Sequence, residues 1–350
     1  MVQARRVSAI ITYDNKDISA DIMPYVKSIS YRDAMSGQAD DLQLTLEDRQ
    51  GLWQSAWMPE LGATLDVSLI TENWQGTGTE PQELRLGTFE LDEIASSGYP
   101  SEAQLKAVSV PFNNTLRGEE HTRSWEKAEL KTIAKDIAAA AGLELYFDTE
   151  YNPTIERAEQ TEQSDLSYLL ALCGDYGLAL KISAGQLIIF DETKYEAADA
   201  LLTIVKPGTA YTAEEGMTYL LSMMGYSFSR KLRDIYAACH VQYQQGKNKA
   251  VIEATFTAPG KTGKTLQIKE QVENTADAER LAKKRLREKN CEEITGSINV
   301  PGSLYLVAGI TVNVLGFGAF DGKYIVTEAQ HNIGSGYTTS IHVRRCLDGY

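Results

Sequence analysis

The chain has 350 residues, 48 of them acidic and 34 basic, and its formal net charge is -14. This length allows two or three domains, and 43% hydrophobic residues is the share of an ordinary folded protein. The acidic excess argues against a protein whose main task is gripping nucleic acid, because phosphates are bound by basic surfaces. An acidic wall that faces DNA without holding it stays open as an alternative.

The N-terminal segment, residues 1–13, has a short basic start but no long apolar core or small-residue cleavage site. We therefore expect a strand here and not a secretion signal. The apolar runs of the chain are only a few residues long, far short of the roughly 20 that a membrane-spanning helix requires. We expect no membrane insertion by this chain.

Residues 7–110 form short segments in which apolar and polar side chains alternate at even spacing, as is typical of a sandwich or barrel. Leu42, Leu44 and Leu46 should share one face of a strand. Between two of these strands, residues 71–81 are polar and rich in glycine, which predicts a long hairpin loop of the kind that often carries function. The predicted strands are 7–13, 26–31, 41–48, 64–70, 85–94 and 104–110.

In residues 111–192 the spacing of apolar residues changes from a period of two to a period of about 3.6, which predicts a small α+β domain. One helix carries a stripe of apolar residues on one face, and this stripe ends before Gly142, a residue suited to a left-handed C-cap. A second helix should begin after Ser164 as its N-cap and end at Gly177. Each helix leads into a strand, and the second strand continues into a hairpin. The two helix-glycine-strand units are either a weak internal repeat or a chance similarity.

From residue 201 onward the strand pattern returns in the runs 201–205, 217–230, 236–243 and 249–257. One helix interrupts it, beginning near Asn274 or Thr275. Its far half carries a basic run composed of Lys283, Lys284, Arg285, Arg287 and Lys289. Cations favour the C-terminal end of a helix dipole, so a solvated helix end explains the run. A basic docking surface for an acidic partner is the alternative.

The closing segment, residues 307–345, contains three alternating runs separated by glycines and predicts a β-meander. Within each run a set of residues should share one face: Ile310, Val312 and Val314, then Tyr324 and Val326, then Tyr337, Thr339, Ile341 and Val343. With the preceding strands it would complete a second β domain.

Residues 258–265, APGKTGKT, fit a relaxed nucleotide-binding loop. Such a loop must lead from a strand into a helix whose N-terminal amides meet the phosphates. Here a strand-like alternation follows, so we expect the tip of a hairpin and no nucleotide site.

The histidines and cysteines predict no metal site, and no motif predicts a cofactor. His121, His240, His331 and His342 lack metal-ligand spacing, and His331 is better placed to hold a turn by bonding loop carbonyls than to act in catalysis. The four cysteines are dispersed in apolar or helical contexts and are expected to be buried free thiols. They are Cys173, Cys239, Cys291 and Cys346.

Carboxylate pairs do not single out a hydrolase site. Residues 40–41 and 47–48 are acidic and lie on or beside a wet strand, and Glu119 and Glu120 are expected in a loop before a helix. Cleavage of a glycosidic bond needs one carboxyl in an apolar setting that raises its pKa, and the sequence indicates no such setting. No catalytic residue is predicted.

Several segments, in this order, resemble the late-control D, or baseplate hub, family of contractile phage tails. They are the N-terminal strand-turn-strand that ends at residues 17–19, the segments 30–49, 57–67, 124–145, 163–182 and 275–286, and the meander around Asp321-Gly322-Lys323-Tyr324. The resemblance implies a mainly β fold with two tube-protein-like β-barrel domains, 1–110 and 193–350, and a small α+β domain, 111–192, between them.

By this resemblance the protein is a structural hub and not an enzyme. Three chains would form a pseudo-sixfold ring that joins a sixfold tail tube to a threefold central spike. Partners would be the tail tube protein, the spike protein, other baseplate proteins and the tape measure protein, in a phage or phage-tail-like particle assembled in the bacterial cytoplasm. DNA would pass through the lumen without specific binding. The alternative is a tail-associated peptidoglycan hydrolase that uses the middle domain.

Overall fold

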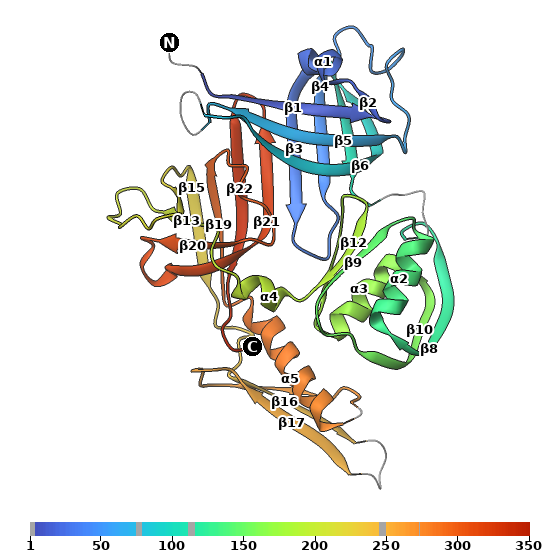
Figure 1. Cartoon of the computed structure of the whole chain (residues 1–350), viewed down its shortest axis with the longest axis vertical. Helices are drawn as coiled ribbons and strands as arrows, with labels where there is room; N and C mark the ends of the chain where they lie inside the picture. Colours follow the sequence, from blue (N-terminus) through green and yellow to red (C-terminus); the bar gives the residue numbers. More distant parts are fainter. Residues whose placement is uncertain (1–3, 75–78, 111–115, 245–249, 273) are drawn as a thin grey trace. The chain divides into compact units, whose positions relative to one another are not determined.

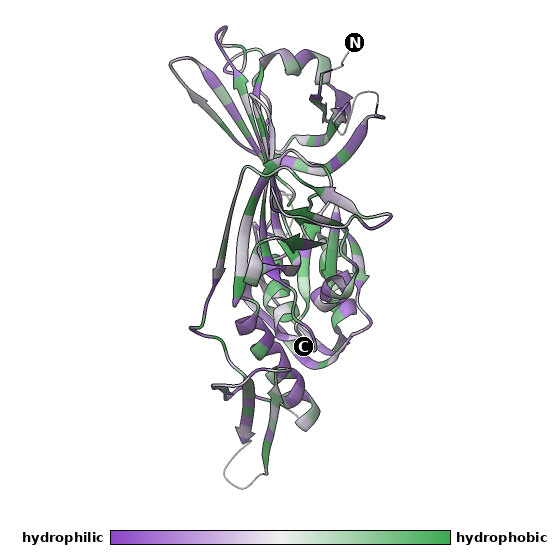
Figure 2. Cartoon of the chain, turned by 90° about the vertical axis from the view of Figure 1, so that its left-hand side faces the viewer, coloured by the Kyte–Doolittle hydropathy of each residue, from purple (hydrophilic) through white to green (hydrophobic). Residues whose placement is uncertain are grey.

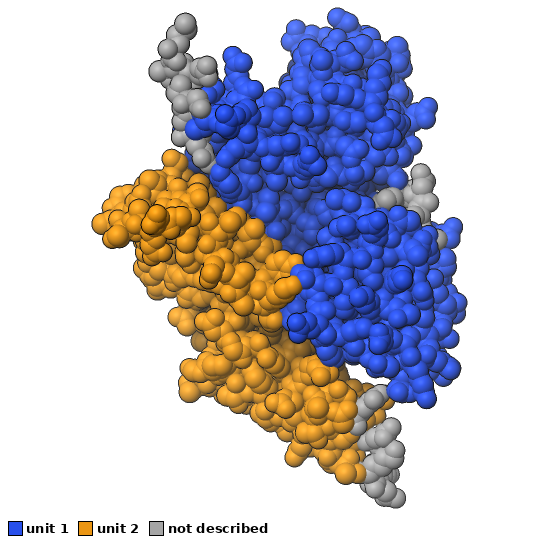
Figure 3. All heavy atoms as spheres, in the orientation of Figure 1, with its two compact units in different colours: residues 1–191, 300–308, 328–341 blue, residues 192–299, 309–327, 342–350 orange. Residues whose placement is uncertain are grey.

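The computed structural model describes residues 4–74, 79–110, 116–244, 250–272 and 274–350 (Figure 1). The chain clusters into two compact units, coloured separately in Figure 3. Unit 1 comprises Met1–Asp191, Val300–Ala308 and Glu328–Ile341, and unit 2 comprises Glu192–Asn299, Gly309–Thr327 and His342–Tyr350. The predicted division at residues 110 and 192 into three domains stays a prediction.

Unit 1 contains an antiparallel sheet that begins with the first strands of the chain. Its order is β2 (Lys16–Asp17), β1 (Arg6–Tyr13), β5 (Thr64–Glu72), β6 (Gln82–Ser97), β7 (Glu102–Val108), β4 (Asp41–Glu47), β3 (Val26–Ala34) and the second half of β21 (Gly322–Ile333). The short helices α1 (Ser19–Ile22) and η1 (Met23–Tyr25) lie between β2 and β3. All six strands expected between residues 7 and 110 are present.

Alternation of apolar and polar side chains builds this sheet, and it is visible as alternating green and purple along several strands in Figure 2. Leu42, Leu44 and Leu46 are all buried on one face of β4, as expected from their period of two. Asp14 and Asn15 have φ of 44° and 65°, the left-handed conformation that a two-residue hairpin turn needs. That turn joins β1 to β2.

Unit 1 also contains the α+β part of the chain. Helices α2 (Leu130–Ala140) and α3 (Asp165–Asp175) pack with a three-stranded sheet, β11 (Ala179–Ser183), β12 (Gln186–Phe190) and β9 (Glu144–Asp148). The predicted caps are confirmed. Ser164 accepts a hydrogen bond from the Ser167 backbone N–H at 3.4 Å, and Gly142 and Gly177 have positive φ.

A two-stranded ribbon of β8 (Glu120–Glu129) and β10 (Thr154–Ser164) completes this part and was not anticipated. The expectation of a loop at Glu120 is therefore wrong, because this residue begins β8 and pairs with Ser164. The exposed polar side chains of the ribbon hid its alternation. Residues 111–115, where the middle domain was expected to begin, lie outside the described residues.

Unit 2 contains a second group of strands. One set has the order β14 (Thr218–Leu220), β13 (Leu202–Val205), β20 (Thr311–Leu315) and β21. In the other set, β15 (Gly225–Arg230) pairs with β19 (Ile294–Pro301), and β19 pairs with β22 (Tyr337–Arg345). The predicted run 217–230 is thus two strands. The expected meander is confirmed as β20, β21 and β22, with short helices α4 (Glu192–Ala197) and η2 (Gly318–Phe320) nearby in sequence.

The rest of unit 2 is a three-stranded sheet, β17 (Val251–Thr257), β16 (Ala238–Gln244) and β18 (Thr265–Ile268), covered on one face by α5 (Thr275–Asn290). Asn274 caps α5 by accepting from the Asp277 backbone N–H at 2.9 Å. Residues 258–265 do not form a hairpin tip as predicted. They connect β17 to β18, and these two strands lie on opposite sides of β16. The segment therefore leads into a strand and not into a helix. A phosphate-binding loop is therefore not formed here.

Candidate functional site

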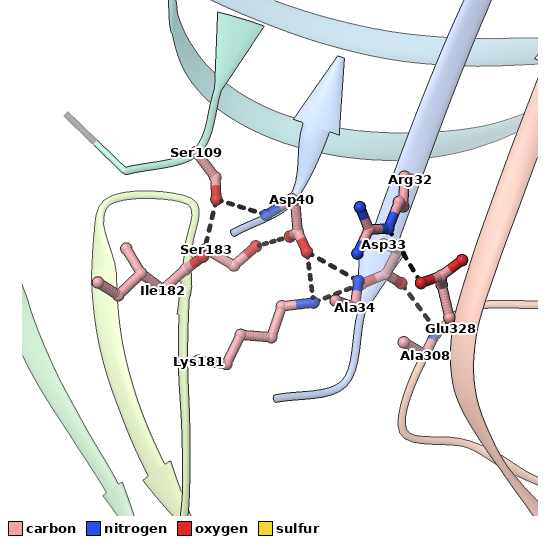
Figure 4. A network of polar contacts seen from close by, with 10 residues as sticks. All are labelled: Arg32, Asp33, Ala34, Asp40, Ser109, Lys181, Ile182, Ser183, Ala308 and Glu328. Atoms are coloured by element: carbon pink, nitrogen blue, oxygen red, sulfur yellow. Dashed lines mark hydrogen bonds and ion pairs between the residues drawn. The ribbon is translucent and has the colours of Figure 1, made fainter. Parts of the chain in front are cut away.

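A buried charge cluster in unit 1 joins the main sheet to the α+β part (Figure 4). Asp33 lies at the end of β3, Asp40 immediately before β4, and Lys181 within β11. The Lys181 ammonium contacts Asp33 Oδ1 and lies 3.2 Å from Asp40 Oδ1. The Asp40 side chain is 0% exposed and that of Lys181 16%. Two carboxylates thus share one ammonium in the interior.

Backbone and hydroxyl donors fix both carboxylates of the cluster. The Ala308 N–H donates to Asp33 Oδ2 at 2.8 Å, and the Ala34 N–H donates to Asp40 Oδ1 at 3.0 Å. The Ser183 hydroxyl donates to Asp40 Oδ2 at 3.2 Å (Figure 4). Such charge-assisted bonds offset part of the cost of removing the carboxylates from water.

Burial changes the proton affinity of these groups. It raises the pKa of Asp40 to about 6, although the Lys181 charge acts in the opposite direction. Burial alone would lower the pKa of Lys181, but the charges of Asp33 and Asp40 outweigh it and raise that pKa. The sequence indicated no carboxyl with a raised pKa, and Asp40 corrects that expectation. Its full burial keeps it out of reach of a polysaccharide.

His331 is buried within unit 1 and has the bracing role expected from the sequence. Its Nε2 lies 3.0 Å from the Leu306 carbonyl, which can only accept, so Nε2 carries the proton. Nδ1 then accepts from the Tyr337 hydroxyl at 2.7 Å. Burial lowers the pKa of His331 to about 4, so the ring is neutral near pH 7. The histidine holds β21 to the loop before β20 and to the start of β22.

The predicted long loop begins beside His331 and Tyr337. β5 ends at Glu72 and β6 begins at Gln82, while residues 75–78 lie outside the described residues. The Trp74 indole N–H donates to the Gly302 carbonyl at 2.5 Å, and its ring lies 5.3 Å from that of Tyr337, centroid to centroid. The start of the loop is thus anchored in unit 1.

A second ionic network lies in unit 2. Arg287 of α5 and Arg344 of β22 both bind the buried carboxylate of Glu196 in α4, and Arg344 Nη2 also donates to Glu192 at 2.7 Å. Burial would raise the pKa of Glu196, but hydrogen bonding from Arg287 and the charge of Arg344 hold it below its usual value. The network therefore favours the ionised carboxylate.

Much of the basic run of α5 is engaged within unit 2, so a solvated helix end describes it only in part. Arg285 donates to Glu270 at 2.8 and 3.0 Å, and the half-buried Arg287 binds the buried Glu196. Lys283 lies 5.8 Å from the centroid of the Phe256 ring. A basic docking surface at this helix stays a prediction.

The cysteines are free thiols, two of them buried and two half-buried. Burial raises the pKa of Cys173 to about 12 and that of Cys239 to about 11, so both are protonated near neutral pH. Cys291 and Cys346, expected to be buried, are the half-buried pair. Among the residues that the structure describes, no group of three or more His, Cys, Asp or Glu is arranged to hold a metal ion.

The sequence of this chain is similar to the sequences of two phage proteins. No family model matches it. It is 26% identical over 199 residues to the "Probable baseplate hub protein" of Escherichia phage 186, and 27% identical over 180 residues to the protein of the same name from Escherichia phage P2. The matches cover 57% and 51% of this chain. The resemblance to phage baseplate hub proteins is confirmed. The chain spans about half the length of these curated relatives, 47% and 44% respectively.

Solved structures share the fold of this chain over nearly its whole length. A tail protein from Neisseria meningitidis MC58 is similar with a TM-score of 0.71 and 13% identity, covering 98% of this chain and 97% of that one. An Escherichia coli protein described as a component of the type VI secretion system, with structural similarity to T4 bacteriophage tail proteins, has a TM-score of 0.58 and 12% identity. That match covers 99% of this chain and 78% of the other. The predicted mainly β class with an α+β part is confirmed.

Proposed function

We propose that this chain is a structural hub of a contractile tail baseplate. The observation that carries the proposal is the sequence similarity of over half of the chain to two hub proteins, together with a shared tail-protein fold over nearly all of it. Three copies form a pseudo-sixfold ring, because each contributes two similar barrel domains. The ring joins the sixfold tail tube to the threefold central spike and transmits load when the sheath contracts.

Open strand edges support a ring made of several copies. Within the described part of the chain, β15 pairs only with β19, so its other edge is open. One edge of β1 pairs with β5, and on the other edge only Thr12 and Tyr13 are paired, with the short strand β2. An exposed edge is a template for pairing with another chain, and closure of a ring removes it. Tyr226 on β15 is 47% exposed, as suits a surface that a second copy covers.

The partners follow from a place at the distal end of the tail. They are the tail tube protein above, the spike protein below, and other baseplate proteins and the tape measure protein around or within the ring. The particle is assembled in the bacterial cytoplasm. Among the described residues, no helix is both long and apolar enough to cross a membrane. The net charge of -14 suits a lumen through which DNA or protein slides without sticking.

An image of the assembled particle tests the proposal directly. We expect three copies at the junction of tube and spike, with two barrel domains of each chain lining one ring. Acidic side chains on the outer rim and lysines along the channel would contradict the proposed acidic lumen. A different copy number or a place outside the baseplate would contradict the hub itself.

The hydrolase alternative has no described site that favours it. In the middle segment, the buried carboxylate of Asp165 is bound by Arg123 and by Gln160, whose Nε2 donates at 2.8 Å. We expect no clearing on a zymogram of bacterial cell wall. Clearing by the purified chain that is lost in Asp165→Asn would establish an enzyme.

A further inference from the structure

The Asp33, Asp40 and Lys181 cluster places a nucleophile, an electrophilic carbon and a proton carrier together. Lys181 Nζ contacts one oxygen of the Asp33 carboxyl group, and the other oxygen of that group is held by the Ala308 N–H at 2.8 Å. Asp40 Oδ1 lies 3.2 Å from the same Nζ. The groups belong to β3, the residue before β4, and β11, so the fold brings together positions far apart in the chain.

We propose that Lys181 and Asp33 condense into an intramolecular isopeptide bond, with Asp40 as the proton carrier. The ammonium first passes a proton to the Asp33 carboxylate, which leaves a neutral amine beside a neutral acid. The Nζ lone pair then attacks Asp33 Cγ, and Asp40 takes the proton from nitrogen while it donates one to oxygen. The Cγ–OH bond breaks, the C–N bond forms, and one water molecule leaves. No oxidant, reductant or further reactant is required.

Burial favours this reaction in two ways. Charged groups are costly to keep in a low-dielectric interior, and conversion of the Lys181 and Asp33 charges into a neutral amide and water removes two charges from it. Fixed reactants also react far faster than free ones, because their relative motion is already restricted. Burial raises the pKa of Asp40 to about 6, which allows its carboxyl to gain and lose a proton near neutral pH.

The bond would connect two parts of unit 1 that otherwise meet through non-covalent contacts. Lys181 and Asp33 are separated by 148 positions in the chain. A covalent link between β3 and β11 would close a long loop and resist separation of the α+β part from the main sheet under load. The inference does not depend on the number of copies or on the partners proposed above.

Intact mass spectrometry of the full chain, purified and stored at neutral pH, tests the proposal. We expect the mass to be lower than the sequence mass by one water molecule, and proteolysis to release a branched peptide that joins the segments containing Asp33 and Lys181. A mass equal to the sequence mass would overturn the proposal. This measurement on the natural sequence does not depend on whether any variant folds.

Variants locate the bond within the cluster. Lys181→Arg keeps the positive charge but removes the amine nucleophile, and Asp33→Ala removes the electrophile, so both should show the full sequence mass. Asp40→Asn keeps both reacting groups and should condense at least tenfold more slowly, because a general acid-base group typically contributes 10² to 10⁴ in rate. Persistence of the water loss in Lys181→Arg or Asp33→Ala would assign it elsewhere and overturn the proposal.

Discussion

At the scale of single residues, His331 links stability to pH. Its pKa is lowered to about 4 in the folded chain, against an ordinary value near 6.5. The unfolded chain therefore binds more protons between these values, and the contribution of His331 is lost as pH falls through that range. We expect about 3 kcal/mol of unfolding free energy to depend on this residue, measured by urea unfolding between pH 7 and pH 4.

The matched variant for this prediction is His331→Gln. Glutamine can still donate to the Leu306 carbonyl but takes up no proton, so the loss of stability with acid should be smaller than in the natural chain. Asp40 acts with the opposite sign. Because its pKa is raised, its contribution to the free energy of unfolding falls as pH rises through about 6. Asp40 is common to both proteins and cancels in the comparison. Equal pH dependence in both would contradict the assignment to His331.

Lys181→Met should be strongly destabilising, because it removes the Lys181 nitrogen and leaves Asp33 and Asp40 buried as two carboxyl groups without that partner. Breaking a buried pair in this way costs about 3–5 kcal/mol. The matched control is Lys27→Met, which removes an exposed pair with Glu102 and should cost less than about 1 kcal/mol. Thermal or urea unfolding of both variants measures the difference. Similar losses in the two would show that the cluster is not the buried anchor described above.

Sequence patterns predicted residues whose environment is local and missed those whose environment depends on distant chain segments. His331 was predicted as a brace because a glycine-rich turn follows it. Asp40 was predicted as solvated because its neighbours in sequence are polar. Its burial arises from Ser109 and Ser183, which are 69 and 143 positions away. The spacing of residues in the sequence does not predict contacts between such distant positions.

At the scale of elements, the end of β19 approaches the start of β22 closely at Gly302. A Cβ placed there would lie 2.0 Å from Cδ1 of the buried Tyr337 ring, which also bonds His331. Gly302→Ala should therefore cost about 1–3 kcal/mol by overpacking. Gly336→Ala is the control, because nothing lies within 4 Å of its Cβ position. Equal unfolding free energies for the two variants would contradict this close approach.

Helix caps and alternating strands were predictable because they depend on residues near in sequence. Ser164, Gly142 and Gly177 mark the ends of α2 and α3 as their residue types require. The β8 and β10 ribbon was missed because Lys127 and Glu162, at φ of 49° and 46°, interrupt its alternation and most of its side chains are exposed. The two strands of the ribbon are separated in sequence by α2 and β9, so their pairing is not a local feature of the sequence.

At the scale of the whole molecule, the proposed ring predicts the mass of the assembly. Native mass spectrometry should show three times the chain mass of 38.7 kDa. Lysine is a residue that blunts strand edges, so the double variant Ser227→Lys with Ser229→Lys on the exposed positions of β15 should shift the population to single chains. The added charges lie on the surface and should change the unfolding free energy by no more than about 0.5 kcal/mol.

The matched control adds the same two charges away from any strand edge. Ala139 and Ala140 are exposed near the end of α2, where lysine is also favoured by the helix dipole. Ala139→Lys with Ala140→Lys should therefore leave the assembly intact. If both double variants dissociate equally, net charge and not the β15 edge governs assembly. If neither dissociates, copies meet through a different surface, and the open edge of β1 becomes the next position to block.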